Sequence, residues 1–88
     1  MTETPLVSML VLTYNQEQFV REAVQSAFSQ TYSPLEIIIS DDCSQDGTYD
    51  IIKAETSAYN GPHKIILNRT RRNLGLAANL NQAWELST

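Results

Sequence analysis

The sequence has few of the residues that build covalent or metal-linked frameworks. Its 88 residues include one cysteine, Cys43, and one histidine, His63. A single cysteine excludes an intramolecular disulfide and fits a reducing compartment. A Cys₄ or Cys₂His₂ zinc site cannot be built from one residue of each kind. With only three glycines, the chain also lacks the G-x-G-x-x-G and Walker A loops of dinucleotide oxidoreductases and P-loop ATPases.

Long apolar runs and a surplus of positive charge are missing as well. No apolar run approaches the roughly 18 residues of a membrane span. Residues 1–5 (MTETP) lack the basic residues that begin a signal peptide. The net charge of −4 argues against a general nucleic-acid binder. We therefore expect a cytoplasmic protein with no membrane segment in this chain, and the cytoplasmic face of a membrane stays open as the location of the full-length protein.

The charges that are present gather in two clusters. Apolar residues make up 42% of the chain, which is too high for disorder. All four aspartates lie within residues 41–50, and four of the six basic residues lie within residues 64–72. Charge that served only solubility would be scattered along the chain. Two clusters of opposite sign therefore suggest a site.

Three short apolar runs predict strands at residues 6–12 (LVSMLVL), 35–39 (LEIII) and 64–67 (KIIL). None of them alternates cleanly between apolar and polar residues. Near-continuous aliphatic runs are what strands buried on both faces require, as in parallel sheets. The runs therefore favour a parallel sheet.

Apolar residues at helical spacing predict a first helix within residues 19–28. The six apolar side chains of this segment fall on one helix face. Asn15 precedes the segment as the expected N-cap, and Gln18 completes a capping-box-like pair with it.

Two further helices are expected. One starts near residues 46–48 and ends before the Asn-Gly-Pro stop at residues 60–62. The other carries an apolar stripe within residues 76–84, and we expect its Trp84 to pack on the sheet. Strands that alternate with helices imply right-handed crossovers and a parallel sheet. The predicted fold class is α/β, a parallel-sheet three-layer α/β/α arrangement that forms the Rossmann-like half of a doubly wound fold.

Polar residues follow each expected strand. In an open parallel sheet, ligands bind outside the carboxyl ends of the strands, and the helix N-termini at that edge favour anions. An aromatic ring, a carboxylate pair and a basic group should therefore meet there. The candidate binding residues are Thr13, Tyr14 and Asn15 after the first strand, Asp41 and Asp42 after the second, and Arg72, Asn73 and Gly75 after the third.

A nucleotide diphosphate is the ligand that this combination suits. Tyr14 can stack on a base, which is worth roughly 1–3 kcal/mol in single-strand binding. A carboxylate can accept from the uracil N3–H and from ribose hydroxyls through bonds worth on the order of 1.5–3 kcal/mol. Arginine forks and a helix N-terminus can hold the diphosphate.

Three stretches resemble motifs of the glycosyltransferase family 2 enzymes. Residues 7–15 (VSMLVLTYN) resemble the opening strand of the family. Residues 29–32 (SQTY), which lead to residues 36–48 (EIIISDDCSQDGT), resemble the next strand and its loop. Residues 72–79 (RNLGLAAN) are similar to the third motif. The order and separation of the three stretches agree with the family over nearly the whole chain.

The resemblance implies a GT-A fold and a nucleotide-diphospho-sugar donor, most often a UDP-sugar. It implies that Tyr14 stacks on the base and that Asp42, with Asp41 beside it, contacts uracil. Arg72 and residues 73–75 would flank the nucleotide. In the full-length enzyme the resemblance implies sugar transfer with inversion, which a divalent cation (Mn²⁺ or Mg²⁺) and a catalytic carboxylate assist.

One departure from the family is large. The metal-binding D-x-D motif of the family follows the third helix, and the sequence given ends at Thr88. The resemblance therefore implies that residues 1–88 are the N-terminal nucleotide-binding part of a glycosyltransferase domain. We expect no catalytic residue and no metal ligand in this part, and no sugar transfer by it alone. We also expect self-association through an unprotected sheet edge.

A second interpretation is a non-enzymatic regulatory α/β module, such as a receiver-like phosphoacceptor domain. Receivers carry an acidic pair after their first strand and the phosphoacceptor after their third. Here the acidic pair follows the second expected strand, and Asn68 and arginines follow the third. This order disfavours the receiver-like interpretation, and saturable UDP binding against phosphorylation by acetyl phosphate would separate the two.

Overall fold

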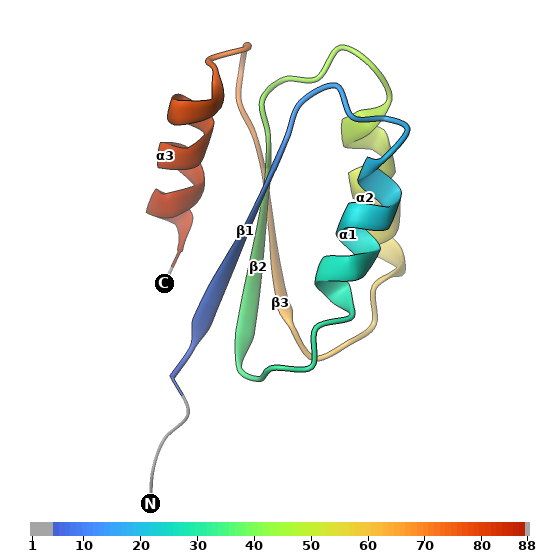
Figure 1. Ribbon diagram of the computed structural model, residues 1–88, viewed down its shortest axis with the longest axis vertical. Helices are drawn as coiled ribbons and strands as arrows, with labels where there is room; N and C mark the ends of the chain where they lie inside the picture. The colour runs from blue at the N-terminus through green and yellow to red at the C-terminus, as the bar shows by residue number, and fades with distance from the viewer. Residues whose placement is uncertain (1–4, 88) are drawn as a thin grey trace, which may run out of the picture.

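The computed structural model describes residues 5–87 (Figure 1). Residues 1–4 and residue 88 lie outside this range. The prediction that residues 1–5 are not the start of a signal peptide therefore concerns residues that are mostly not described. Strand and helix alternate three times, and each expected element is present. The elements are β1 (Val7–Thr13), α1 (Val20–Phe28), β2 (Leu35–Asp41), α2 (Thr48–Ala58), β3 (Lys64–Arg69) and α3 (Leu76–Leu86).

The three strands form one parallel sheet in the order β1-β2-β3. Val11 of β1 pairs with Ile39 of β2, which pairs with Leu67 of β3. The helices α1 and α2 cover one face of the sheet, and α3 covers the other (Figure 1). This confirms the predicted three-layer α/β/α arrangement. The central strand β2 is buried along its whole length, which is why its sequence is nearly continuously aliphatic.

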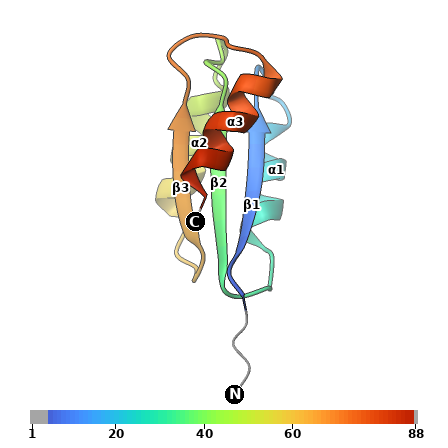
Figure 2. The same cartoon turned by 90° about the vertical axis from the view of Figure 1, so that its left-hand side faces the viewer.

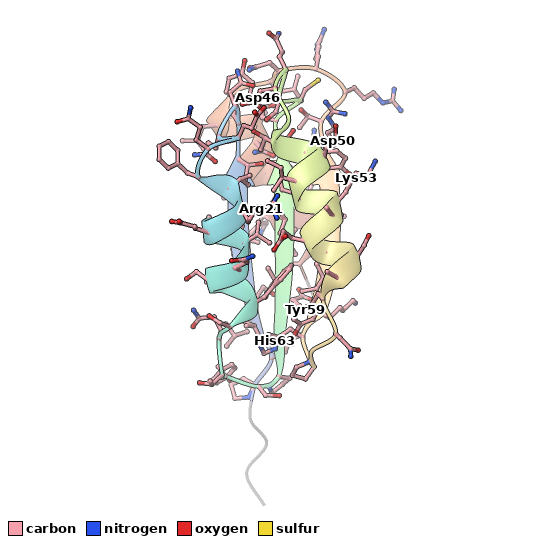
Figure 3. The ribbon with its side chains drawn as sticks, turned by 90° about the vertical axis from the view of Figure 1, so that its right-hand side faces the viewer. Arg21, Asp46, Asp50, Lys53, Tyr59 and His63 are labelled. Atoms are coloured by element: carbon pink, nitrogen blue, oxygen red, sulfur yellow. The ribbon has the colours of Figure 1, made fainter. Side chains whose placement is uncertain are left out.

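The face of the sheet beneath α1 and α2 holds the apolar core. Ile37 and Ile39 of β2 are 0% and 1% exposed, and they pack with Val24 of α1 and Ile52 of α2. Because strand side chains alternate between faces, the odd-numbered strand positions all point to this side. Figure 3 views this layer from outside, where Arg21 of α1 lies toward α2. The partly buried strand residues Met9, Val11, Ile65 and Leu67 extend the core.

On the opposite face of the sheet, polar side chains of the strands form hydrogen bonds with α3. Figure 2 shows α3 crossing the sheet over its strands. The hydroxyl of Ser40 in β2 donates to the Asn79 amide oxygen in α3, and Asn79 Nδ2 donates to the Ser40 carbonyl at 2.9 Å. Asn68 of β3 donates to Ser40 Oγ at 2.8 Å and to Gln82 Oε1 at 3.1 Å. A hydrogen-bonded network therefore helps to dock α3, in addition to buried apolar residues such as Ile38 of β2 and Ala83 of α3.

The first helix begins later than predicted, at Val20, and Asn15 is not its N-cap. The φ of Asn15 is 49°, and its side-chain oxygen accepts from the Gln45 amide at 2.8 Å. The Gln16 amide donates to Thr48 Oγ1 at 2.8 Å. The capping-box prediction was wrong because these polar groups bind the loop before α2 instead of the start of α1.

Two aromatic side chains of the predicted apolar stripes are exposed, and one of them, Trp84, was expected to pack on the sheet. Phe19 and Trp84 are each 69% exposed. On α3 the buried residues are Asn79 and Ala83, which are four positions apart. Since the stripe that contains Leu76 and Trp84 lies on the neighbouring side of the helix, it turns away from the sheet. The expectation that Trp84 packs on the sheet was therefore wrong.

Candidate functional site

The carboxyl ends of the three strands are tied together just beyond the sheet. The Asp42 amide donates to the Thr13 carbonyl at 2.9 Å, and the Thr70 amide donates to the Asp41 carbonyl at 2.9 Å. Both bonds continue the hydrogen bonding between neighbouring strands. The segments that follow β1, β2 and β3 therefore start from a common edge, the upper end of the sheet in Figure 1.

A cavity of about 330 Å³ opens at this edge. It lies within the size range of small-molecule sites, about 300–1,000 Å³. The walls come from the ends of β1 and β2, the loop after β3 and the start of α3. Five of the predicted binding residues line this cavity, namely Thr13, Tyr14, Asp42, Asn73 and Gly75.

Asp42 connects the cavity to the loop after β3. Its side chain is 4% exposed. Oδ1 accepts from the Leu74 amide at 2.9 Å and from the Thr70 hydroxyl at 3.0 Å, while Oδ2 accepts from the Gly75 amide at 2.8 Å. Burial raises the pKa of this carboxyl, but the bonds from Leu74, Thr70 and Gly75 outweigh it and hold the pKa below its ordinary value. Asp42 is therefore an ionised, pre-positioned acceptor.

Tyr14 and Gly75 leave two walls of the cavity open to a ligand. Tyr14 directly follows β1 and is 40% exposed, so its ring is available for stacking. Gly75 stands immediately before α3 with a φ of +91°, where a side chain is strained. A Cβ at Gly75 would meet no atom within 4 Å. The glycine is therefore required by the backbone conformation, and the space above it is free.

Asp41 faces away from the cavity. It is 0% exposed and accepts from Thr13 Oγ1 at 2.7 Å and from the amide and hydroxyl of Ser44 at 2.8 Å and 2.6 Å. Arg69 Nε lies 3.8 Å from Asp41 Oδ2. These contacts fix the turn after β2, and Asp41 is not among the cavity-lining residues. Direct contact between Asp41 and a nucleotide remains a prediction.

Asn15 and Arg72 also lie outside the cavity lining. The Asn15 amide donates to Ser44 Oγ at 2.8 Å, and its side chain binds the Gln45 amide. Asn15 thus joins the loops after β1 and β2 directly behind Tyr14. Arg72 lies beside a second hollow, on the other side of the loop after β3. Nucleotide contacts by Asn15 and Arg72 remain predictions.

Four further residues of the cavity were not predicted from the sequence. Leu12, Gln16, Leu76 and Asn79 also line the cavity. Asn79 is 1% exposed and is bonded to Ser40. Asn79 could have been noticed as a polar residue among the apolar positions of the helix. Its hydrogen-bond partner Ser40, on a distant strand, could not be identified from residue spacing.

Residues 5–87 form neither a metal cluster nor a membrane-crossing helix. Within this range no three His, Cys, Asp or Glu side chains come together in a way that could hold a metal ion. No helix in the same range combines the length and the hydrophobicity needed to cross a bilayer.

Sequence comparisons show that the chain is similar to glycosyltransferases. The profile of Glycosyl transferase family 2 matches residues 8–88. An uncharacterized glycosyltransferase of Haemophilus influenzae is 42% identical over 81 residues, which cover 92% of this chain and 24% of that protein. The Escherichia coli UDP-Glc:alpha-D-GlcNAc-diphosphoundecaprenol beta-1,3-glucosyltransferase WfaP is 51% identical over 47 residues, covering 53% of this chain and 19% of that protein. The chain spans only 31% and 24% of the first two curated relatives.

Structural comparison agrees with the sequence comparisons. The mannosyltransferase PcManGT from Pyrobaculum calidifontis, solved with GDP-Man and Mn²⁺, superposes with a TM-score of 0.88 at 27% identity. The match covers 99% of this chain and 26% of that one. The fold is that of the GT-A glycosyltransferases, and the receiver-like interpretation is set aside. The profile match and the shared fold together show that the chain belongs to glycosyl transferase family 2.

Proposed function

We propose that this chain binds the nucleotide-diphospho-sugar donor of a glycosyltransferase that transfers the sugar with inversion. The observation that carries the proposal is the cavity at the carboxyl edge of the sheet, where Tyr14, Asp42 and Gly75 arrive from three different strands. This is the edge at which parallel α/β sheets bind ligands. The cavity offers an exposed aromatic ring, an ionised carboxylate and an open backbone.

The hydrogen bonds of Asp42 leave room for a ligand. Oδ1 accepts two bonds and Oδ2 accepts one, from Gly75. A carboxylate oxygen has two acceptor sites, so Oδ2 retains one. The imide N3–H of uracil is a donor that suits this oxygen, and Tyr14 can stack on the same base. UDP is therefore the donor nucleotide that we propose.

Two similar proteins support a donor of this class. The E. coli relative is named for transfer from UDP-Glc, and the Pyrobaculum structure contains GDP-Man and Mn²⁺. Because the chain spans between a quarter and a third of that structure and of the first curated relative, residues 1–88 are proposed as the nucleotide-binding part of a larger transferase domain. Metal ligands, the base and the acceptor region would come from other segments, and the cytoplasm is the proposed location.

The direct test is calorimetric titration of residues 1–88 with UDP and with GDP. We expect saturable UDP binding, and weakening of at least about tenfold for Asp42→Ala because a charge-assisted bond is lost. Asp50→Ala is the matched control, since Asp50 is an exposed carboxylate in the first turn of α2 (Figure 3). Equal affinities for Asp42→Ala, Asp50→Ala and the unaltered chain, or no binding of either nucleotide, would contradict the proposal.

A further inference from the structure

A second hollow, of about 590 Å³, lies on the other side of the loop after β3. Its lining includes Arg69, Arg71 and Arg72 together with the amide side chains of Asn68 and Gln82. No acidic residue lines it. This surface is here called the arginine hollow. It is positively charged, whereas the chain as a whole carries a net charge of −4.

One of the three arginines is already engaged. Arg69 donates from NH2 to the Ser44 carbonyl at 3.0 Å, and its guanidinium lies 4.9 Å from the centre of the Tyr49 ring. Its Nε is 3.8 Å from Asp41 Oδ2. These contacts turn the Arg69 guanidinium toward α2 and beside the Asp41 carboxylate, so Arg71 and Arg72 supply the free positive charge of the hollow.

The other two arginines have no acceptor. Among residues 5–87, no hydrogen bond or ion pair involves the guanidinium of Arg71 or Arg72, although each is exposed. Gln82 accepts from Asn68 through its oxygen, and its Nε2 donates to no group in the described part of the chain. The hollow therefore presents uncommitted N–H donors of two kinds.

The backbone that carries Arg71 and Arg72 is held in place. The Thr70 hydroxyl lies 2.7 Å from the Arg72 carbonyl and 3.0 Å from Asp42 Oδ1, and its single proton can be donated to either oxygen. The Cys43 thiol lies 3.8 Å from the Arg71 carbonyl, which accepts from it. A fixed backbone lowers the cost of ordering these side chains around a ligand.

We propose that the arginine hollow binds a phosphate group of a second ligand, separately from the donor cavity. Planar guanidinium groups match the oxygens of phosphate with paired hydrogen bonds, and the Gln82 amide adds a neutral donor. The loop of residues 70–75 stands between the two sites, since Asp42 faces the donor cavity and binds Thr70, Leu74 and Gly75. A small phosphate ester and a phospholipid headgroup share this chemistry.

The test is an NMR titration of residues 1–88 with inorganic phosphate, at low and high ionic strength. We expect saturable shifts at Arg71, Arg72 and the Gln82 side-chain amide, with binding that weakens as salt rises. The double variant Arg71→Gln/Arg72→Gln should weaken phosphate binding at least about tenfold. Arg71→Lys/Arg72→Lys keeps the charge and should recover part of the affinity, while the spectrum reports whether each variant is folded.

The matched control removes two positive charges elsewhere. Arg21→Gln/Lys53→Gln alters one residue on each of α1 and α2, both labelled in Figure 3, and it should change the phosphate affinity less than twofold. Equal weakening by the two double variants would show a diffuse effect of net charge and overturn the proposal. Absence of saturable shifts in the unaltered chain would overturn it as well.

Two further measurements separate this site from the donor cavity and identify the ligand source. Tyr14→Ala should leave the affinity for phosphate unchanged, whether or not this variant still binds UDP. Competition by UDP for the same shifts would assign the hollow to the donor diphosphate and contradict a separate site. Vesicles of phosphatidylglycerol that bind through Arg71 and Arg72 would support a lipid headgroup, whereas phosphate binding without vesicle binding would support a small phosphate ester.

Discussion

The two faces of the sheet are built from different chemistry. Beneath α1 and α2, the aliphatic residues Ile37, Ile39 and Ile52 form a closed core. Beneath α3, the polar network of Ser40 and Asn79 lies beside the buried apolar residues Ile38 and Ala83, and Leu76 and Trp84 face outward. The first face holds the larger cluster of buried apolar residues. The second face positions the start of α3, which lines the proposed donor cavity.

Among the described residues, those of the main apolar core and those that line the cavity are different sets. Apolar burial is non-directional. Hydrogen bonds between buried side chains require fixed geometry and so specify one arrangement. The network at Asn79 fixes α3 against β2, and Asp42 fixes the loop that precedes α3. Substitutions on the two faces should therefore differ in the kind of effect that they have as well as in its size.

The largest loss of stability is expected from Ile52→Ala in the closed core. Ile52 is 0% exposed, and truncation of a buried isoleucine costs about 2–5 kcal/mol. Urea unfolding followed by circular dichroism measures the change. Ile52→Val is the graded control, with an expected cost of about 0.5–1.5 kcal/mol. A loss for Ile52→Ala no greater than that of an exposed α3 residue such as Leu80→Ala would contradict the distinction between the faces.

Asp42→Asn should cost about 1–3 kcal/mol at neutral pH, because the amide nitrogen cannot accept from Gly75. The folded-state pKa of Asp42 is below the unfolded value of roughly 3.9, so the unfolded state binds more protons at acidic pH. The stability that this carboxylate contributes is present above about pH 4 and is lost as the pH falls through the folded pKa.

Urea unfolding at pH 7 and pH 3 checks this dependence on the Asp42 carboxylate. The gap between Asp42→Asn and the unaltered chain should narrow at pH 3. Asp46 also has a lowered pKa, through the Thr48 hydroxyl first, so the variant should retain some sensitivity to acid. A gap that stays constant from pH 7 to pH 3 would argue against an ionised Asp42 that holds the loop.

Asn79→Ala should cost about 1–3 kcal/mol, since it leaves the Ser40 carbonyl and hydroxyl without their α3 partners. The double variant Ser40→Ala/Asn79→Leu replaces the polar pair with apolar groups and should recover part of that loss. Thermal unfolding of the single and double variants provides the comparison. If Ser40→Ala/Asn79→Leu loses the sum of the costs of Ser40→Ala and Asn79→Leu measured singly, the two side chains do not act as a pair.

The smallest change in stability is expected for Trp84→Ala, within about 0.5 kcal/mol, because the side chain is 69% exposed. Its effect should appear in association instead. Exposed apolar side chains on α3 and the open edges of the sheet favour self-association, and Trp84→Ala should reduce it in light scattering. A chain that stays monomeric at high concentration, with or without Trp84, would refute this expectation.

The order of the elements could be predicted from the sequence because buried strands need aliphatic runs and because Gly47 and Gly61 mark their turns. The hydrogen-bond partners of individual side chains could be predicted less well. Asn15 and Asp41 both had local signals for other roles, yet their bonds run to Ser44 and neighbouring residues that spacing could not identify. The outward turn of Trp84 depends on how α3 rotates over the polar network, which is a tertiary effect.

The most direct test is an NMR titration of residues 1–88 with UDP that reports every backbone amide. The predicted result is a saturable set of shifts at Tyr14, Asp42, Asn73 and Gly75, which lie on three segments, with the amides of the α1 and α2 face unchanged. Shifts confined to one segment, or centred on α1 and α2, would contradict a donor site assembled from three strand ends.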